Sequence, residues 1–151
     1  MKNKLLAMFA VAAIGFSFSS MSMATLIDGD VITGNDGGDC PILGEDVRLN
    51  LSKGVKGAYE CSEVSNSIDV GACHESGSRG TALTCAQIGF EADGTTPKYN
   101  NAGCTAANVG DTITITTASY KGFRASTTGG SVGAQSLSAK CTDSTVEELL
   151  K

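Results

Sequence analysis

The sequence is poor in aromatic and basic residues, and these shortages exclude several classes of function. It contains no Trp and only 5% aromatic residues, whereas sites that cleave sugars normally offer aromatic surface. Its 11 basic residues face 16 acidic ones, which gives a formal net charge of -5. Proteins that bind nucleic acid or anionic membranes through bulk charge need a basic surface. The composition therefore argues against both of these binding functions.

The sequence also has a single histidine, His74, and no cysteine pair in a C-x-x-C arrangement. The missing pair removes the thioredoxin-like motif, c-type haem attachment and the usual zinc sites. A triad of His74, Asp93 or Asp111, and Ser131 can be composed, since residues 129–133 match G-x-S-x-G. That motif needs a strand, a turn and a helix around its serine, but here it lies in a glycine-rich turn. We therefore expect no catalytic residue and no cofactor.

Acidic residues are so frequent that a glycosidase-like pair of carboxylates can be chosen in several ways. The candidates are Glu60, Glu63, Asp69, Glu75 and Glu91. Such a pair needs a fixed separation, which a sequence does not reveal. We interpret these residues as a solvated acidic surface.

The first 24 residues have the three parts of a secretory signal peptide of bacterial type. Lys2 and Lys4 precede an apolar run over residues 5–18, and small residues lead to a cleavage site before Thr25. The run is shorter than the roughly 20 residues that a membrane-spanning helix needs. We therefore predict a mature chain without a membrane span, outside the cell, at its surface or in the periplasm.

Residues 25–39 combine glycines with carboxylates and predict a flexible acidic arm. The four carboxylates are those of Asp28, Asp30, Asp36 and Asp39. They make calcium a weak alternative, because Ca²⁺ prefers several oxygen ligands but their spacing fits no complete calcium motif. The arm also holds apolar residues that can add a strand to the free sheet edge of another protein. These residues are Leu26, Ile27, Val31 and Ile32.

Residues 40–151 hold six cysteines, which predict up to three disulfides in an exported chain. They are Cys40, Cys61, Cys73, Cys85, Cys104 and Cys141. Disulfides contribute about 2–4 kcal/mol each and would support a thin core. A cross-strand bridge between Cys61 and Cys73 is one candidate, and the sequence leaves the connectivity open.

Alternation of apolar and polar residues predicts short β-strands in the first half of this domain. One strand is expected over residues 47–51. Two more, over residues 57–63 and 68–74, are joined by Ser65 and Asn66 and predict a hairpin.

The second half contains the clearest strand, over residues 112–118, with a partner expected at residues 120–125. A glycine-rich turn follows at residues 128–133. Residues 75–84 and 93–110 are rich in turn-forming residues and predict loops.

Alternation also assigns faces near Tyr120. In a strand, Tyr120 and Arg124 point one way and Phe123 the other. We expect Phe123 in the core, with Tyr120 and Arg124 on a possible contact surface.

The C-terminus predicts one short helix. Ser144 and Glu147 fit a capping box ahead of two leucines, and Cys141 ties the base of the helix to the body. Short strands, turns and little helix predict an all-β fold, a small disulfide-braced antiparallel β-sandwich or barrel.

These observations favour an exported non-enzymatic protein that self-associates or binds another cell-surface protein, as a subunit of an extracellular layer or fibre. The alternative is a monomeric secreted binding or inhibitor module that uses the braced loops over residues 75–84 or 93–110. A small hydrolase resting on His74 is a third hypothesis.

Overall fold

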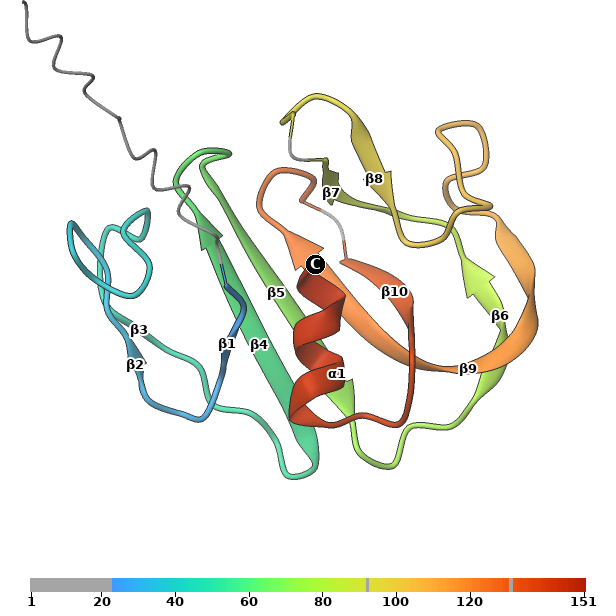
Figure 1. Ribbon diagram of the computed structural model, residues 1–151, viewed down its shortest axis with the longest axis horizontal. Helices are drawn as coiled ribbons and strands as arrows, with labels where there is room; N and C mark the ends of the chain where they lie inside the picture. Colours follow the sequence, from blue (N-terminus) through green and yellow to red (C-terminus); the bar gives the residue numbers. More distant parts are fainter. Residues whose placement is uncertain (1–22, 92, 131) are drawn as a thin grey trace, which may run out of the picture.

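The computed structural model describes residues 23–91, 93–130 and 132–151, and its centre is one antiparallel β-sheet (Figure 1). The strands follow one another in the order β1-β4-β5-β9-β10. They are β1 (Thr25–Leu26), β4 (Val55–Ser62), β5 (Ser67–His74), β9 (Thr112–Ser126) and β10 (Val132–Leu137). A further strand, β6 (Gly80–Thr84), pairs with the first half of β9.

Two small strand pairs and a terminal helix complete the described chain. The pairs are β2 (Val31–Ile32) with β3 (Val47–Arg48), and β7 (Gln87–Phe90) with β8 (Pro97–Tyr99). The helix α1 (Asp143–Glu147) continues into a 3-10 turn, η1 (Glu148–Leu150). The predicted fold class is thereby confirmed: antiparallel β-structure with one short C-terminal helix and three disulfides.

The predicted hairpin is present as β4 and β5, but its register excludes the disulfide expected within it. Ser62 lies opposite Ser67, so Cys61 faces Ile68 and not Cys73. Asn66, at φ 49°, closes this tight turn. The Cys61–Cys73 prediction is wrong. The three bridges are Cys40–Cys61, Cys73–Cys141 and Cys85–Cys104.

The strand β9 is longer than the sequence predicts. The segments over residues 112–118 and 120–125, expected as partners, form one continuous strand of 15 residues. Its first half pairs with β6, which occupies part of the predicted loop over residues 75–84. Its second half pairs with β5 and β10. Only Ser119 separates the two segments, and it is not one of the residues, such as Gly or Pro, that are depleted in strands. The strand β8 likewise lies within the predicted loop over residues 93–110.

The C-terminal helix covers one face of the sheet, which we call the inner face. Val146, Leu149 and Leu150 are buried there against residues of β4, β5 and β10. Two glycines allow this close approach. A Cβ on Gly122 would lie 2.6 Å from Cδ1 of Leu149, and one on Gly71 would lie 3.2 Å from Leu149 Cβ.

The helix begins two residues earlier than predicted. Thr142 is the N-cap, and the capping box joins it to Thr145, not Ser144 to Glu147. The Thr145 N–H donates to Thr142 Oγ1 at 3.3 Å, and the Thr142 N–H donates to Thr145 Oγ1 at 2.8 Å. Thr145 is buried, so its hydroxyl has no solvent to compete for this hydrogen bond.

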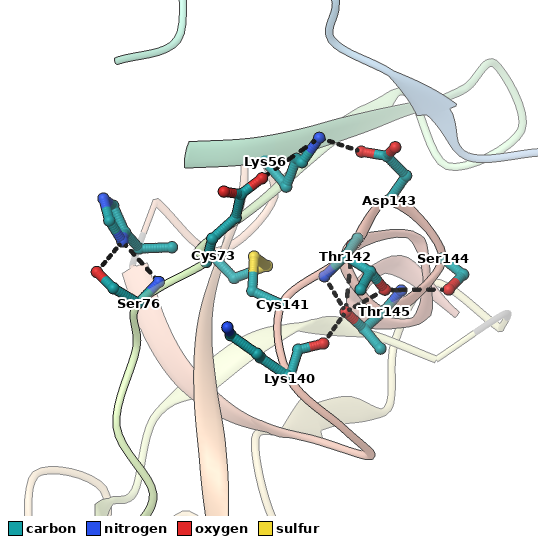
Figure 2. Close-up of a disulfide and its surroundings, with 11 residues drawn as sticks. Lys56, Cys73, Ser76, Lys140, Cys141, Thr142, Asp143, Ser144 and Thr145 are labelled. Atoms are coloured by element: carbon teal, nitrogen blue, oxygen red, sulfur yellow. Dashed lines mark hydrogen bonds and ion pairs between the residues drawn. A yellow bond between two sulfur atoms is a disulfide. The ribbon is translucent and has the colours of Figure 1, made fainter. Parts of the chain in front are cut away.

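Covalent and ionic contacts hold the start of the helix to the sheet (Figure 2). The Cys73–Cys141 disulfide joins it to β5, as expected for Cys141. Lys56 Nζ lies 3.1 Å from Asp143 Oδ1 and 3.7 Å from Glu75 Oε1. Asp143 first, and Glu75 second, raise the pKa of Lys56.

Residues 27–50 form what we call the N-terminal lobe, which covers part of the opposite, outer face. Ile32 and Cys40 are buried there against Tyr59, and half-buried apolar residues of β4 and β5 pack around them. In Figure 1 the lobe lies beside β4, at one end of the sheet. The Cys40–Cys61 disulfide ties the lobe to β4.

The segment over residues 25–39, for which the sequence predicts a flexible arm, pairs with its own chain in the structure. The strand β1 adds to β4, and β2 adds to β3. Asp39 Oδ2 accepts hydrogen bonds from the Thr33 N–H at 3.1 Å and from its hydroxyl at 2.8 Å. These bonds lower the pKa of Asp39. The backbone of this segment is therefore hydrogen-bonded within its own chain, where the sequence predicts a flexible arm.

The three disulfides indicate an oxidising extracellular or periplasmic environment. Within residues 23–91, 93–130 and 132–151, no helix is long and apolar enough to span a membrane. The predicted signal peptide lies outside the described residues, apart from Met23 and Ala24.

Candidate functional site

The apolar residues of the predicted arm contribute mainly to their own chain. Leu26 packs against the inner-face cluster, and Ile27 packs against the cluster beneath the N-terminal lobe. Ile32 is only 8% exposed, whereas Val31 is 41% exposed. Val31 is therefore the one of these four that presents a large apolar surface outward.

The structure reverses the predicted orientation of Phe123 and Arg124. Phe123 is 53% exposed, whereas Arg124 is 4% exposed, and Tyr120 packs against the inner-face cluster. The prediction that Phe123 enters the core is wrong. Alternation separates the two faces of a strand, but it does not say which face other elements cover.

An apolar surface lies on the outer side of β9 and β10, beyond the N-terminal lobe. We call it the open outer face, made of Phe123, Ala125, Val132 and Ala134. It borders Ile68 and Val70 of β5, which also pack against the cluster beneath the N-terminal lobe. Val132 is 68% exposed. A shallow groove of about 260 Å³ runs between Ile68, Val70, Ala125 and Val132.

The charge of this face differs from that of the rest of the chain. The strands β9 and β10 contain no acidic residue, and Lys121 is the charged residue of β9 on the outer side. Its Nζ donates to Ser136 Oγ at 3.3 Å, and burial lowers its pKa. The N-terminal lobe, by contrast, carries six acidic residues and one basic residue. The acids are Asp28, Asp30, Asp36, Asp39, Glu45 and Asp46.

The acids of the lobe do not converge on a common point. No group of three or more Asp, Glu, His or Cys side chains that could hold a metal ion occurs among the described residues. Asp28 Oδ1 accepts from the Asp30 N–H at 3.1 Å, and Asp46 Oδ1 accepts from the Gly34 N–H at 2.9 Å. These carboxylates shape turns in the lobe.

A polar pocket of about 340 Å³ lies on the inner face, next to the end of the C-terminal helix. We call it the Arg124 pocket. Glu60, Asp69 and Ser126 occupy facing positions on β4, β5 and β9 and line one wall. Arg124 Nη1 donates to the Leu149 carbonyl at 3.2 Å.

The ion pair in this pocket leaves hydrogen-bonding groups unused. Arg124 Nη2 lies 3.4 Å from Asp69 Oδ1, without the geometry of a hydrogen bond. Asp69 Oδ1 and Arg124 Nε are both buried, and neither has a hydrogen-bond partner among the described residues. The side chain of Asp69 is 13% exposed, so it does not belong to a solvated acidic surface.

The hairpin of β7 and β8 forms the second wall of the Arg124 pocket, with Phe90, Glu91 and Lys98. Lys98 Nζ donates to the Lys151 carbonyl at 2.9 Å. The chain on either side of the hairpin is held by the Cys85–Cys104 disulfide. The sequence missed this pocket, because its residues come together only through the strand register.

Asn100 fixes the hairpin to the sheet. Its amide nitrogen donates to the Thr84 carbonyl at 2.8 Å, and its Oδ1 accepts from the Ala86 N–H at 2.9 Å. The same nitrogen also donates to the Ala134 carbonyl of β10. A buried amide with several partners holds the pocket wall in one position.

His74 lies apart from both surfaces and is exposed. Its Nδ1 accepts from the Ser76 N–H at 3.1 Å and lies 2.7 Å from Ser76 Oγ. Asp93 Oδ1 accepts a hydrogen bond from the Thr96 N–H at 2.8 Å within its own turn. Ser131 lies outside the described residues. The contacts of the described residues do not assemble the triad composed from the sequence.

No protein-family model matches the chain, and no curated protein or solved structure matches it significantly.

Proposed function

We propose that the protein is an exported, non-enzymatic structural subunit that self-associates in an extracellular layer or fibre. The open outer face carries this proposal. Phe123 and Val132 are 53% and 68% exposed at neighbouring positions, next to an apolar groove of about 260 Å³. Contiguous exposed apolar surface of this kind marks interaction sites of proteins.

The occupant we propose is the N-terminal lobe of a second copy. Within one chain, the lobe already covers the β4 side of the outer face and leaves β9 and β10 uncovered. The uncovered strands contain no acid, whereas the lobe has six acids and the exposed Val31. The lobe of a second copy would cover the outer side of β9 and β10 and would bring its acidic residues close to Lys121.

This contact joins two different surfaces, so it does not close by two-fold symmetry. Contacts of this head-to-tail kind generate rings or open filaments. Because Lys121 faces acids of the neighbouring lobe, added salt weakens the association. The same arrangement explains why an acidic chain keeps two adjacent strands free of acid.

The experiment compares the solution mass of the mature, non-reduced protein with that of two variants by size-exclusion chromatography and light scattering. The double variant Phe123→Ser/Val132→Ser removes the apolar surface. Val109→Ser is the matched control, because Val109 is 50% exposed and is a loop residue that does not belong to the open outer face.

Under the proposal, the wild type and the control form assemblies that grow with concentration and shrink with salt. The double variant is a monomer with an unchanged circular dichroism spectrum. A wild type that remains monomeric over a wide concentration range overturns the proposal. Equal assembly of the double variant and the wild type overturns the proposed surface.

The Arg124 pocket favours a second candidate, a monomeric secreted binding module. The pocket lies between the β4–β5 turn and the β7–β8 hairpin, beside the Cys85–Cys104 disulfide. This candidate predicts a stable monomer whose ligand is held on the inner face.

A further inference from the structure

The Arg124 pocket presents fixed charges of both signs to the same space. Glu60, Asp69 and Glu91 line it from three strands or their ends, and Arg124 and Lys98 line it as well. The three acids would repel a phosphate or carboxylate ligand, and the two bases would repel an ammonium ligand. Juxtaposed like charges oppose binding, so ligands of one fixed sign fit poorly.

Arg124 Nε and Asp69 Oδ1 have no hydrogen-bond partner among the described residues, although Asp69 Oδ1 forms the ion pair with Arg124 Nη2 at 3.4 Å. Both atoms are buried, so the groups that a ligand reaches are those of the rest of the polar lining. A hydroxyl group both donates and accepts hydrogen bonds, so hydroxyls of the lining match those of a ligand. The remaining polar lining consists largely of hydroxyls, in the pairs Ser65–Ser67, at 2.7 Å, and Ser126–Thr128, at 2.8 Å.

The pocket also has an apolar side and a suitable size. Phe90 and Leu150 line it beside the polar groups. The C–H face of a sugar ring can pack on such a surface while its hydroxyls bind the polar wall. Its volume of about 340 Å³ lies at the lower end of the range for small-molecule sites.

From these features we infer that the Arg124 pocket binds a neutral polyhydroxylated ligand of the hexose class, free or as the terminal residue of a glycan. This inference is independent of self-association, because the pocket lies on the inner face and the open outer face lies on the other side of the sheet. It concerns binding and assigns no bond cleavage. It differs from the sequence interpretation for Asp69, whose side chain is 13% exposed, whereas Glu91 is exposed as that interpretation expects.

The experiment is an NMR titration of the ¹⁵N-labelled, non-reduced mature protein. The probes are glucose, galactose and N-acetylglucosamine, each free and as the terminal residue of a trisaccharide, together with inorganic phosphate and an alkylammonium salt. The variant Glu60→Gln removes one lining carboxylate. Glu63→Gln is the matched control, because Glu63 is an exposed acid of the neighbouring turn outside the pocket.

We expect at least one sugar to cause saturable shifts at Ser62, Ser67 and Ser126. Hydrogen bonds to charged groups predict at least a tenfold loss of affinity in Glu60→Gln, at roughly constant affinity in Glu63→Gln. Tighter binding of the trisaccharide identifies a glycan end as the source of the ligand, and equal binding identifies a free sugar.

Three results overturn the inference. The first is that no sugar causes saturable shifts at the pocket up to about 100 mM, well beyond millimolar affinity. The second is that phosphate or the ammonium salt binds there in preference to every sugar. The third is that Glu60→Gln and Glu63→Gln, both folded by their spectra, bind sugar equally well.

Discussion

We predict that the Cys73–Cys141 disulfide contributes more to stability than the Cys85–Cys104 disulfide. It closes a loop of 68 residues, whereas Cys85–Cys104 closes a loop of 19. Loop-closure entropy at these lengths corresponds to about 4.4 and about 3.2 kcal/mol, a difference of about 1.2 kcal/mol. Removing the first bridge with Cys73→Ala/Cys141→Ala also frees the start of the helix that covers the inner face.

The measurement is equilibrium unfolding in guanidinium chloride, with the free energy of unfolding extrapolated to water. The matched control is Cys85→Ala/Cys104→Ala, which removes a bridge of the same chemistry from a shorter loop. We expect the larger loss of stability and the larger rise in m-value for Cys73→Ala/Cys141→Ala, because its unfolded chain expands more. A loss that equals or falls below that of the control would refute the entropic argument.

Three further predictions concern single positions. Leu149→Ala should cost about 2–5 kcal/mol in thermal unfolding, because this 1% exposed side chain fills the space above Gly71 and Gly122. Gly122→Ala should cost about 1–3 kcal/mol through overpacking against Leu149, and the two changes together should cost less than their sum. Asp93 should titrate at a pKa of about 2 in a carbon NMR titration, because the Thr96 hydroxyl first, and backbone N–H groups second, hydrogen-bond its carboxylate. Since this pKa is depressed, the contribution of the turn is complete above about pH 4 and is lost as the pH falls through about 2; a midpoint near 4 would contradict this.

The features that the sequence predicts well are those set by local signals. The β4–β5 hairpin follows from alternation on both sides of Asn66, which adopts the positive φ of 49° that the turn requires. The C-terminal helix follows from a polar cap ahead of Leu149 and Leu150, although the cap itself is Thr142. Errors of two residues at such an end arise because several neighbouring hydroxyls can serve as caps.

The features that the sequence does not predict depend on pairing between distant strands. The partner of Cys73 is Cys141, and nothing near either residue encodes that contact. The strand β6 sits in a segment whose glycines and serines predict a loop, and it becomes a strand because β9 extends far enough to pair with it. The pocket acids Glu60 and Asp69 face one another for the same reason.

The reversed orientation of Phe123 and Arg124 has a local signal after all, in the glycines of the inner face. Gly122 lies two residues before Arg124 on β9 and therefore on the same face, and Gly133 lies opposite Arg124 on β10. A glycine inside a strand often marks a place where another element approaches closely. A Cβ on Gly122 would meet Leu149 at 2.6 Å, and one on Gly133 would meet Ile88 at 2.6 Å. The glycine-lined face is therefore the covered one, and this leaves Phe123, on the other face, exposed to solvent.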